Sequence, residues 1–162
     1  ADDAWKMPKR ILRNLITCAR DGGNYLLNIG PKPDGSVPEE SVRILNTIGG
    51  WMDKYGHTIY GAERCNVKRS AFANFTRKGN TLYVHVHFWP GQEWAIGGLR
   101  TKVLSAKLLP KGEPVDYEQD EFRVKFSGLP EEAPDNPISV LELECASAPV
   151  QDMVFVRMNR PR

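Results

Sequence analysis

The sequence predicts a piece of a parallel α/β fold over residues 1–62, followed by an all-β antiparallel sandwich over residues 63–162. Three observations predict this order. Apolar residues recur at helical spacing in two early stretches, a short and almost wholly apolar run lies between them, and an alternation of period two begins after about Cys65. Closely spaced strands without intervening helices are typical of a sandwich or barrel.

The first helix is predicted over Lys9–Arg20. Its apolar residues are spaced to form one stripe, and they are Ile11, Leu12, Leu15, Ile16 and Ala19. Gly22 and Gly23 follow the stripe and are expected to end the helix.

The run Tyr25–Ile29 is predicted to be a buried strand, because it is nearly all apolar and lacks the alternation of a half-exposed strand. One such strand with two helices leaves both strand edges unpaired and two apolar helix faces uncovered. We therefore expect residues 1–60 to be the last element of a parallel α/β fold whose earlier strands lie outside this chain.

A second helix is predicted to follow a turn-rich loop and to run to about Tyr55. Ser36 and Glu39 have the spacing of a capping box, and Pro38 lies in the first turn. The apolar side chains expected to face inward are Ile44, Leu45, Ile48, Trp51 and Met52. Gly56 is expected to end this helix.

The second part begins with a predicted hairpin, in which Ala71–Thr76 and Thr81–Trp89 flank a turn. Side chains of the second strand alternate, with Leu82, Val84, Val86 and Phe88 on one face and Tyr83, His85, His87 and Trp89 on the other. Further strands are expected at Glu93–Ile96, Lys102–Leu109, Pro114–Tyr117, Glu121–Phe126, Ile138–Cys145 and Met153–Met158.

The composition is that of a globular protein, with 41% apolar and 26% charged residues. The net charge of +2 gives no reason to expect nucleic acid or an anionic membrane as a partner. No apolar run approaches the roughly 20 residues of a membrane span. The sequence starts at Ala1 without Met or a visible signal peptide, so we expect its start to be a processed end, a cleavage point or the edge of a fragment.

The three cysteines are Cys18, Cys65 and Cys145. No two of them have the spacing of metal ligands, so the sequence predicts neither a metal site nor a cofactor. Buried free thiols that pack as small apolar side chains are favoured, and a single disulfide is the alternative.

A specific resemblance is carried by two phrases, GGNYLLNIGPKPDGSVPEES at residues 22–41 and IGGWMDKYGHTIYGA at residues 48–62. Both resemble the end of the catalytic domain in α-L-fucosidases of glycoside hydrolase family 29. The matching positions are Gly22, Gly23, Asn24, Leu26, Leu27, Asn28, Ile29, Gly30, Pro31, Asp34 and Gly35, then Trp51, Gly56, Ile59 and Tyr60. The resemblance implies that the first phrase closes a (β/α)8-like barrel and that a C-terminal β-sandwich follows it.

One position departs from the resemblance, since His57 stands where the family usually has Glu. If that Glu supports local structure, His can replace it with a hydrogen bond; if it is functional, this copy is altered. The structural role is favoured, because the position lies past the end of the predicted helix.

The resemblance implies a retaining enzyme that releases terminal α-L-fucose from glycans. Retention uses two carboxyl groups roughly 5–5.5 Å apart, one as nucleophile and one as acid and base. In the family both lie upstream of the matching region, so the resemblance places no catalytic residue in this chain, and the chain alone is expected to be inactive. The implied partners are the upstream barrel segment and a fucosylated glycan, with homo-oligomers left open, and the implied location is secreted, periplasmic or lysosomal.

Asn28, Pro31 and Asp34 are candidates for the rim of the active site, because loops after the strands of such a barrel carry its active site. Asp34 also belongs to an ordinary Pro-Asp-Gly-Ser turn, and the turn is favoured. Asn28, near the end of a buried strand, needs a hydrogen-bond partner and is expected to support a neighbouring loop rather than to contact the sugar.

The aromatic face of the second hairpin strand has two interpretations. His85 and His87 could form part of a metal site, but no third ligand is suggested nearby. Trp89 and Trp94 are the first candidates for stacking on a sugar, although aromatic residues in a small domain more often pack internally. Packing is therefore favoured for this face.

Three functions compete at this point. The leading one is the C-terminal portion of a fucosidase, which completes and braces the barrel. The second is a freestanding carbohydrate-binding sandwich that keeps a remnant of a barrel. The third is a purely structural module.

Overall fold

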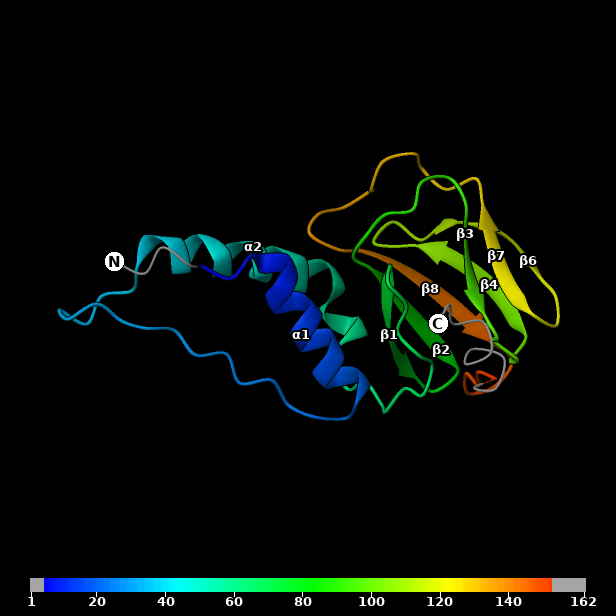
Figure 1. Cartoon of the computed structure of the whole chain (residues 1–162), viewed down its shortest axis with the longest axis horizontal. Coiled ribbons are helices and arrows are strands. Elements are labelled where there is room, and N and C mark those ends of the chain that lie inside the picture. Colours follow the sequence, from blue (N-terminus) through cyan, green and yellow to red (C-terminus); the bar gives the residue numbers. More distant parts are fainter. Residues whose placement is uncertain (1–4, 153–162) are drawn as a thin grey trace, which may run out of the picture.

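The computed structural model describes residues 5–152, which form a helical layer beside two antiparallel sheets (Figure 1). The helices are α1 (Pro8–Arg20), α2 (Glu39–Tyr55) and the short 3-10 helix η1 (Gly56–Thr58). The strands are β1 (Ala73–Lys78), β2 (Thr81–Val86), β3 (Trp94–Gly97), β4 (Val103–Leu108), β5 (Glu113–Pro114), β6 (Asp116–Gln119), β7 (Arg123–Ser127) and β8 (Ser139–Cys145). No helix within residues 5–152 combines the length and the apolar character needed to cross a bilayer.

The predicted sandwich is confirmed. One sheet has the strand order β1-β2-β8-β4-β5, the other has the order β3-β7-β6, and all neighbours are antiparallel. The β1–β2 hairpin turns at Gly79, whose φ of 55° suits a residue without a side chain. The predicted strand at Pro114–Tyr117 is divided between β5 and β6, and the predicted strand Met153–Met158 lies outside the described residues.

The sandwich core lies between the two sheets and takes the aliphatic face of β2. Leu82, Val84 and Val86 all point into it, as the alternation predicts. The alternation is wrong beyond Val86, where β2 ends: Phe88 is exposed beside α1, and Trp89 packs against the sandwich core. Phe75 of β1 and Phe126 of β7 are fully buried beside them. Burial of side chains this large supplies the main hydrophobic stabilisation of the sandwich.

A second core joins the helical layer to the outer face of the larger sheet (Figure 1). Leu12 and Ile16 of α1 and Trp51 of α2 pack there against Tyr83 and Val140. The indole Nε1 of Trp51 donates a hydrogen bond of 2.8 Å to the carbonyl of Ile138, so this large ring is buried with its polar atom satisfied. The helical layer is thus fixed to the sandwich by a buried apolar interface.

The end of α2 is tied to the loop before β8 by a small polar network. The Tyr55 hydroxyl donates to Asp135 Oδ2 at 2.7 Å, and Lys54 Nζ donates to the same oxygen at 2.9 Å. Partial burial raises the pKa of Asp135, but the hydrogen bonds from Lys54 and Tyr55 outweigh it and lower that pKa below its usual value. Burial and the adjacent carboxylate both raise the pKa of Tyr55, which therefore stays protonated as the donor.

The prediction of a strand at Tyr25–Ile29 is wrong for this chain. The segment is extended but pairs with no strand in residues 5–152, and Leu26 is 92% exposed. Figure 1 shows why, because the segment runs alongside the helices and away from both sheets. Without neighbouring parallel strands an apolar segment of this kind has no backbone partners and no cover for its side chains.

Two details of the second helix also differ from expectation. Pro38 is the N-cap, no side chain caps this end, and Ser36 bonds Asp34 instead, so the predicted capping box is absent. The inward face is fully buried at Trp51, while Ile44 is half-buried and Leu45 remains 36% exposed. The first half of the apolar face of α2 is therefore only partly covered by the described residues.

Candidate active-site rim

The loop between the extended segment and α2 forms a tight turn around Asp34. Its Oδ1 accepts hydrogen bonds from the Ser36 amide at 2.9 Å and from the Ser36 hydroxyl at 2.7 Å. The turn is closed by two backbone bonds of 2.8 Å, from Gly35 to Lys32 and from Lys32 to Ser36. Gly35 has a φ of 83°, so the turn geometry favoured for this sequence is confirmed.

The electrostatics of Asp34 follow from the same contacts. Hydrogen bonds from the Ser36 side chain and then from its backbone lower the pKa of the exposed Asp34 carboxyl below the ordinary value. The group is ionised at neutral pH, whereas a general acid needs a raised pKa. Asp34 can therefore accept hydrogen bonds from a ligand but is unsuited to protonate one.

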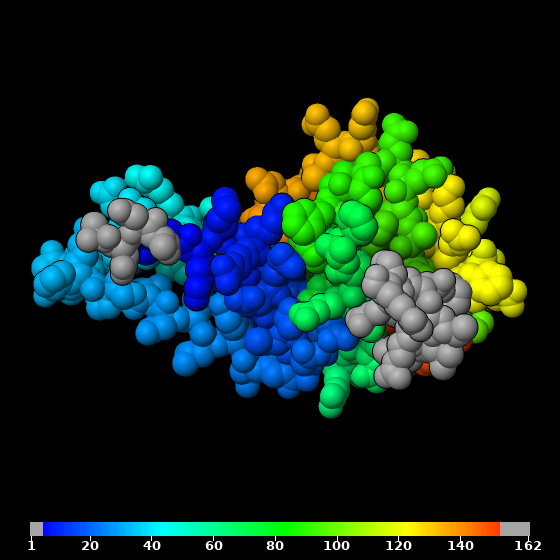
Figure 2. Space-filling model, viewed as in Figure 1, coloured from blue at the N-terminus to red at the C-terminus, as the bar shows by residue number. Residues whose placement is uncertain are grey.

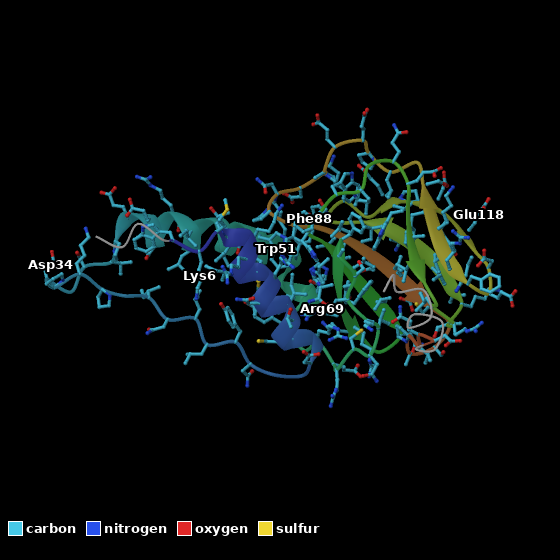
Figure 3. All side chains as sticks on the ribbon, in the orientation of Figure 1. Lys6, Asp34, Trp51, Arg69, Phe88 and Glu118 are labelled. Carbon is cyan, nitrogen blue, oxygen red and sulfur yellow. The ribbon has the colours of Figure 1, made fainter. Side chains whose placement is uncertain are left out.

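Asn28 and Pro31 lie on the exposed segment that leads to this turn. Asn28 lines a groove of about 340 Å³ between that segment and the two helices, together with Trp5, Lys6, Ile11, Leu27, Ile29, Gly30, Ser41, Ile44 and Leu45. Within residues 5–152 no hydrogen bond engages the Asn28 side chain, so the partner expected for it is not among them. The three rim candidates share one solvent-open segment, and Asp34 lies at its tip, far from the sandwich (Figure 3).

The tryptophans proposed for sugar stacking both take part in packing. Trp89 Nε1 donates to the Pro130 carbonyl at 2.8 Å, and the ring packs against the sandwich core. Trp94 stacks on Phe126 with a centroid separation of 5.8 Å and an interplanar angle of 26°. Both side chains are only partly buried, and their contact with a sugar stays a prediction.

The histidine face packs against the helical layer, as favoured. His85 is fully buried, and its ring lies 6.0 Å from Trp51. The Thr76 hydroxyl donates to the Thr58 carbonyl at 2.8 Å, so it accepts a hydrogen from His85 Nε2, also at 2.8 Å. His85 Nδ1 is then a buried acceptor with no partner in the described structure.

His87 and His57 lie at the edges of this face. His87 is buried and its Nε2 donates to the Ala71 carbonyl at 3.2 Å. His57 is exposed, and its ring meets Tyr83 edge-on at 5.9 Å. No group of three or more Cys, His, Asp or Glu side chains in residues 5–152 is arranged to hold a metal ion. All three cysteines are free, with Cys65 and Cys145 buried and Cys18 half-buried, so the disulfide alternative is wrong.

Comparisons with known proteins agree with this arrangement. The sequence profile described as α-L-fucosidase matches residues 1–57. Tissue α-L-fucosidase from Mus musculus is 29% identical over 143 residues, which cover 84% of this chain and 30% of that protein. Among solved structures, α-L-fucosidase isoenzyme 1 from Paenibacillus thiaminolyticus superposes with a TM-score of 0.79 at 31% identity, over 90% of this chain and 36% of that one.

Residues 1–57 match the α-L-fucosidase family, and similarity to α-L-fucosidases extends over most of the chain. The α-fucosidase from Thermotoga maritima gives a TM-score of 0.76 at 27% identity, over 88% of this chain and 35% of that one. The fold is shared with a glycoside hydrolase family 29 α-L-fucosidase from Bacteroides thetaiotaomicron, with a TM-score of 0.79 at 24% identity, over 89% of this chain and 33% of that one. It spans about a third of the length of these relatives.

Sequence reasoning overlooked a set of basic side chains in this chain. Lys6, Lys9, Arg10, Arg13 and Arg69 line one groove along α1. Part of the signal was available, because Arg13 follows Lys9 by four residues and Arg10 by three, which places these three side chains on one side of a helix. The sequence could not have indicated that Arg69 belongs to this groove, because only the fold brings Arg69 close to α1.

Proposed function

We propose that the whole protein is a retaining α-L-fucosidase that hydrolyses terminal α-L-fucose from glycans, and that this chain completes and braces its barrel. The observation that carries the proposal is the open apolar segment Tyr25–Ile29 beside the partly exposed first half of α2, where Leu45 is 36% exposed. A segment with unpaired backbone and exposed Leu26 is stable only when other strands and helices cover it. The length of the relatives supports this, because about two thirds of each lies outside the match.

The two hydrophobic cores indicate separate roles for the two parts of the chain. Residues 1–62 supply the last strand and helices of the barrel, and residues 63–162 form the sandwich. The second core, in which Trp51 packs against Tyr83, binds the barrel helices to the sandwich. The sandwich thereby orients α1 and α2 so that their remaining apolar side chains pack against the rest of the barrel.

The catalytic step is assigned to the preceding part of the protein. Retention requires a nucleophilic carboxylate and an acid/base carboxyl roughly 5–5.5 Å apart. Asp34 is engaged in its turn and has a lowered pKa, so it fits neither role. Asn28, Pro31 and Asp34 contribute to the rim that the sugar passes, where amide and carboxylate oxygens can accept hydrogen bonds from sugar hydroxyls.

The substrate class rests on relatives. A structure of the Thermotoga maritima α-fucosidase in complex with fucose superposes with a TM-score of 0.73 at 26% identity, over 85% of this chain and 34% of that one. Relatives include tissue and plasma α-L-fucosidases, which supports a secreted or lysosomal location for this protein.

The test compares the whole protein with residues 1–162 alone on an aryl α-L-fucoside and on a fucosylated oligosaccharide. We expect fucose release from the whole protein only, with the α-anomer as the first product detected by proton NMR. Release of β-fucose would contradict retention. A folded whole protein without fucosidase activity would overturn the proposed function.

A further inference from the structure

An open groove of about 840 Å³ runs along the solvent side of α1. Every charged side chain that lines it is basic, and these are Lys6, Lys9, Arg10, Arg13 and Arg69. Trp5, Met7, Asn14 and Thr17 complete the lining. Figure 2 shows α1 in dark blue on the face turned to the viewer, and Figure 3 places Lys6 and Arg69 on opposite sides of it.

The cations are held in place by two different elements. Lys9, Arg10 and Arg13 occupy one side of α1, and Arg69 comes from the loop before β1. Lys9 Nζ and Arg13 Cζ each lie 5.8 Å from the centroid of the exposed Phe88 ring, a geometry suited to cation–π attraction. Phe88 therefore fixes two of the charges while leaving the others directed to solvent.

The charges are not balanced within residues 5–152. None of the ion pairs there includes any of the five cations. The first turn of α1 holds no acidic residue, so Lys9 and Arg10 face the positive end of the helix dipole. Neighbouring like charges on a helix repel one another, and an anion bound between them would relieve this repulsion.

We propose that this groove binds an anionic glycan, carrying sulfate or carboxylate groups, as a second site on the protein. The assignment to a glycan rests on the proposed function, which brings glycans to this protein. Acidic groups spaced along a polymer match the row of cations, and guanidinium groups bind sulfate and carboxylate oxygens bidentately. Trp5 adds an apolar ring in the same groove for a sugar face.

The experiment measures binding of the whole protein to heparin as the sulfated probe, hyaluronan as the carboxylated probe and dextran as the neutral one. The test variant is Arg10→Glu with Arg69→Glu, which reverses one charge from each side of the groove. The matched control is Lys102→Glu with Lys107→Glu, which makes the same charge change on exposed side chains of the sandwich. Circular dichroism and the melting temperature establish that both variants are folded.

We expect heparin to bind at low salt and dextran not to bind. The affinity should weaken about tenfold or more in the groove variant and less than about threefold in the control, and it should fall as salt rises. Hyaluronan binding would assign carboxylate recognition as well as sulfate recognition. Equal losses in both variants, or no heparin binding by the wild type, would overturn the proposal.

Two further arms separate this proposal from its rivals. A single-stranded oligonucleotide of matched charge that binds more tightly than heparin would overturn the glycan assignment. The wild-type protein is assayed in parallel on an uncharged aryl fucoside. Activity without heparin binding counts against the groove alone, and heparin binding without activity counts against the proposed function alone.

Discussion

Tyr55 shows how one hydroxyl can connect two segments far apart in the sequence. The buried ring belongs to the second core, and its hydroxyl donates a hydrogen bond of 2.7 Å to Asp135, which lies 80 residues further along the chain. Lys54 shares the same carboxylate. The end of α2 is thereby fixed to the loop that leads into β8.

We expect Tyr55→Phe to lower the free energy of unfolding by about 1–2 kcal/mol, because a hydrogen bond to a charged, partly buried group is lost. Urea denaturation of the protein at pH 7 measures this. Tyr60→Phe is the matched control, since Tyr60 is 67% exposed. Equal stability of the two variants would contradict the role given to the Asp135 contact.

His85 makes stability depend on pH. Burial, and then the neighbouring His87 and His57, lower the pKa of His85 to about 3. Above about pH 6.5 both folded and unfolded states hold a neutral ring, so there is no effect. Below about pH 6.5 the His85 ring is protonated in the unfolded state but stays neutral in the folded state. The free energy of unfolding therefore falls as the pH falls toward 3.

We expect the free energy of unfolding to fall by about 2 kcal/mol on account of His85 between pH 6.5 and pH 5. The pKa values of Asp34, Asp120 and Asp135 are lowered, so these carboxyl groups change the free energy of unfolding only at more acidic pH. Between about pH 6.5 and pH 5 the change is therefore assigned to histidine. Burial also lowers the pKa of His87, to about 4, and adds a slope of the same sign. Urea titrations of wild type and His85→Gln measure the difference, and parallel pH slopes would refute it.

At the scale of elements, Tyr25–Ile29 shows that a strand-like composition does not produce a strand without neighbouring strands to pair with. Its composition predicts a strand buried on both faces, and this prediction fails among the described residues because a strand's own residues cannot supply its hydrogen-bonded partners. The sandwich strands were predictable because alternation in β2 and β8 sorts side chains between two faces within one chain. The missing cap of α2 illustrates a local competition, in which Ser36 bonds the nearer Asp34.

We expect Leu26→Asp to change the stability of residues 1–162 alone by less than about 0.5 kcal/mol, because the side chain is already exposed. In the whole protein the same change buries a charge and should cost about 3 kcal/mol or more, with loss of fucosidase activity. Leu104→Asp, on the exposed face of β4, is the control and should be mild in both contexts. A mild effect of Leu26→Asp in both would mean that the segment is not covered.

At the scale of the whole molecule, the two cores make the helical layer and the sandwich interdependent. The placement of Asn28, Pro31 and Asp34 at an active-site rim stays a prediction, because it depends on surroundings beyond residues 5–152. The basic groove was only partly predictable: the spacing of Lys9, Arg10 and Arg13 indicates one basic helix side, whereas Arg69 and Phe88 reach α1 only through folding. Sequence spacing therefore identified the elements, and tertiary proximity determined which side chains share a surface.

We expect removal of residues 63–162 from the whole protein to leave it aggregated or inactive. The cut exposes Leu12, Ile16 and Trp51, which are now buried against the sandwich. Size-exclusion chromatography and fucosidase assays measure the outcome. A soluble, monomeric and fully active truncated enzyme would show that the sandwich is dispensable for bracing the barrel.

The placement of β2 between two hydrophobic interiors fixes its alignment unusually firmly. A slip of one residue relative to β8 would turn Leu82, Val84 and Val86 toward the helices and drive Tyr83 and His85 into the space between the sheets. Neither interior has room or polar partners for that exchange. A hairpin with shifted register should therefore be unstable, because it fits neither interior.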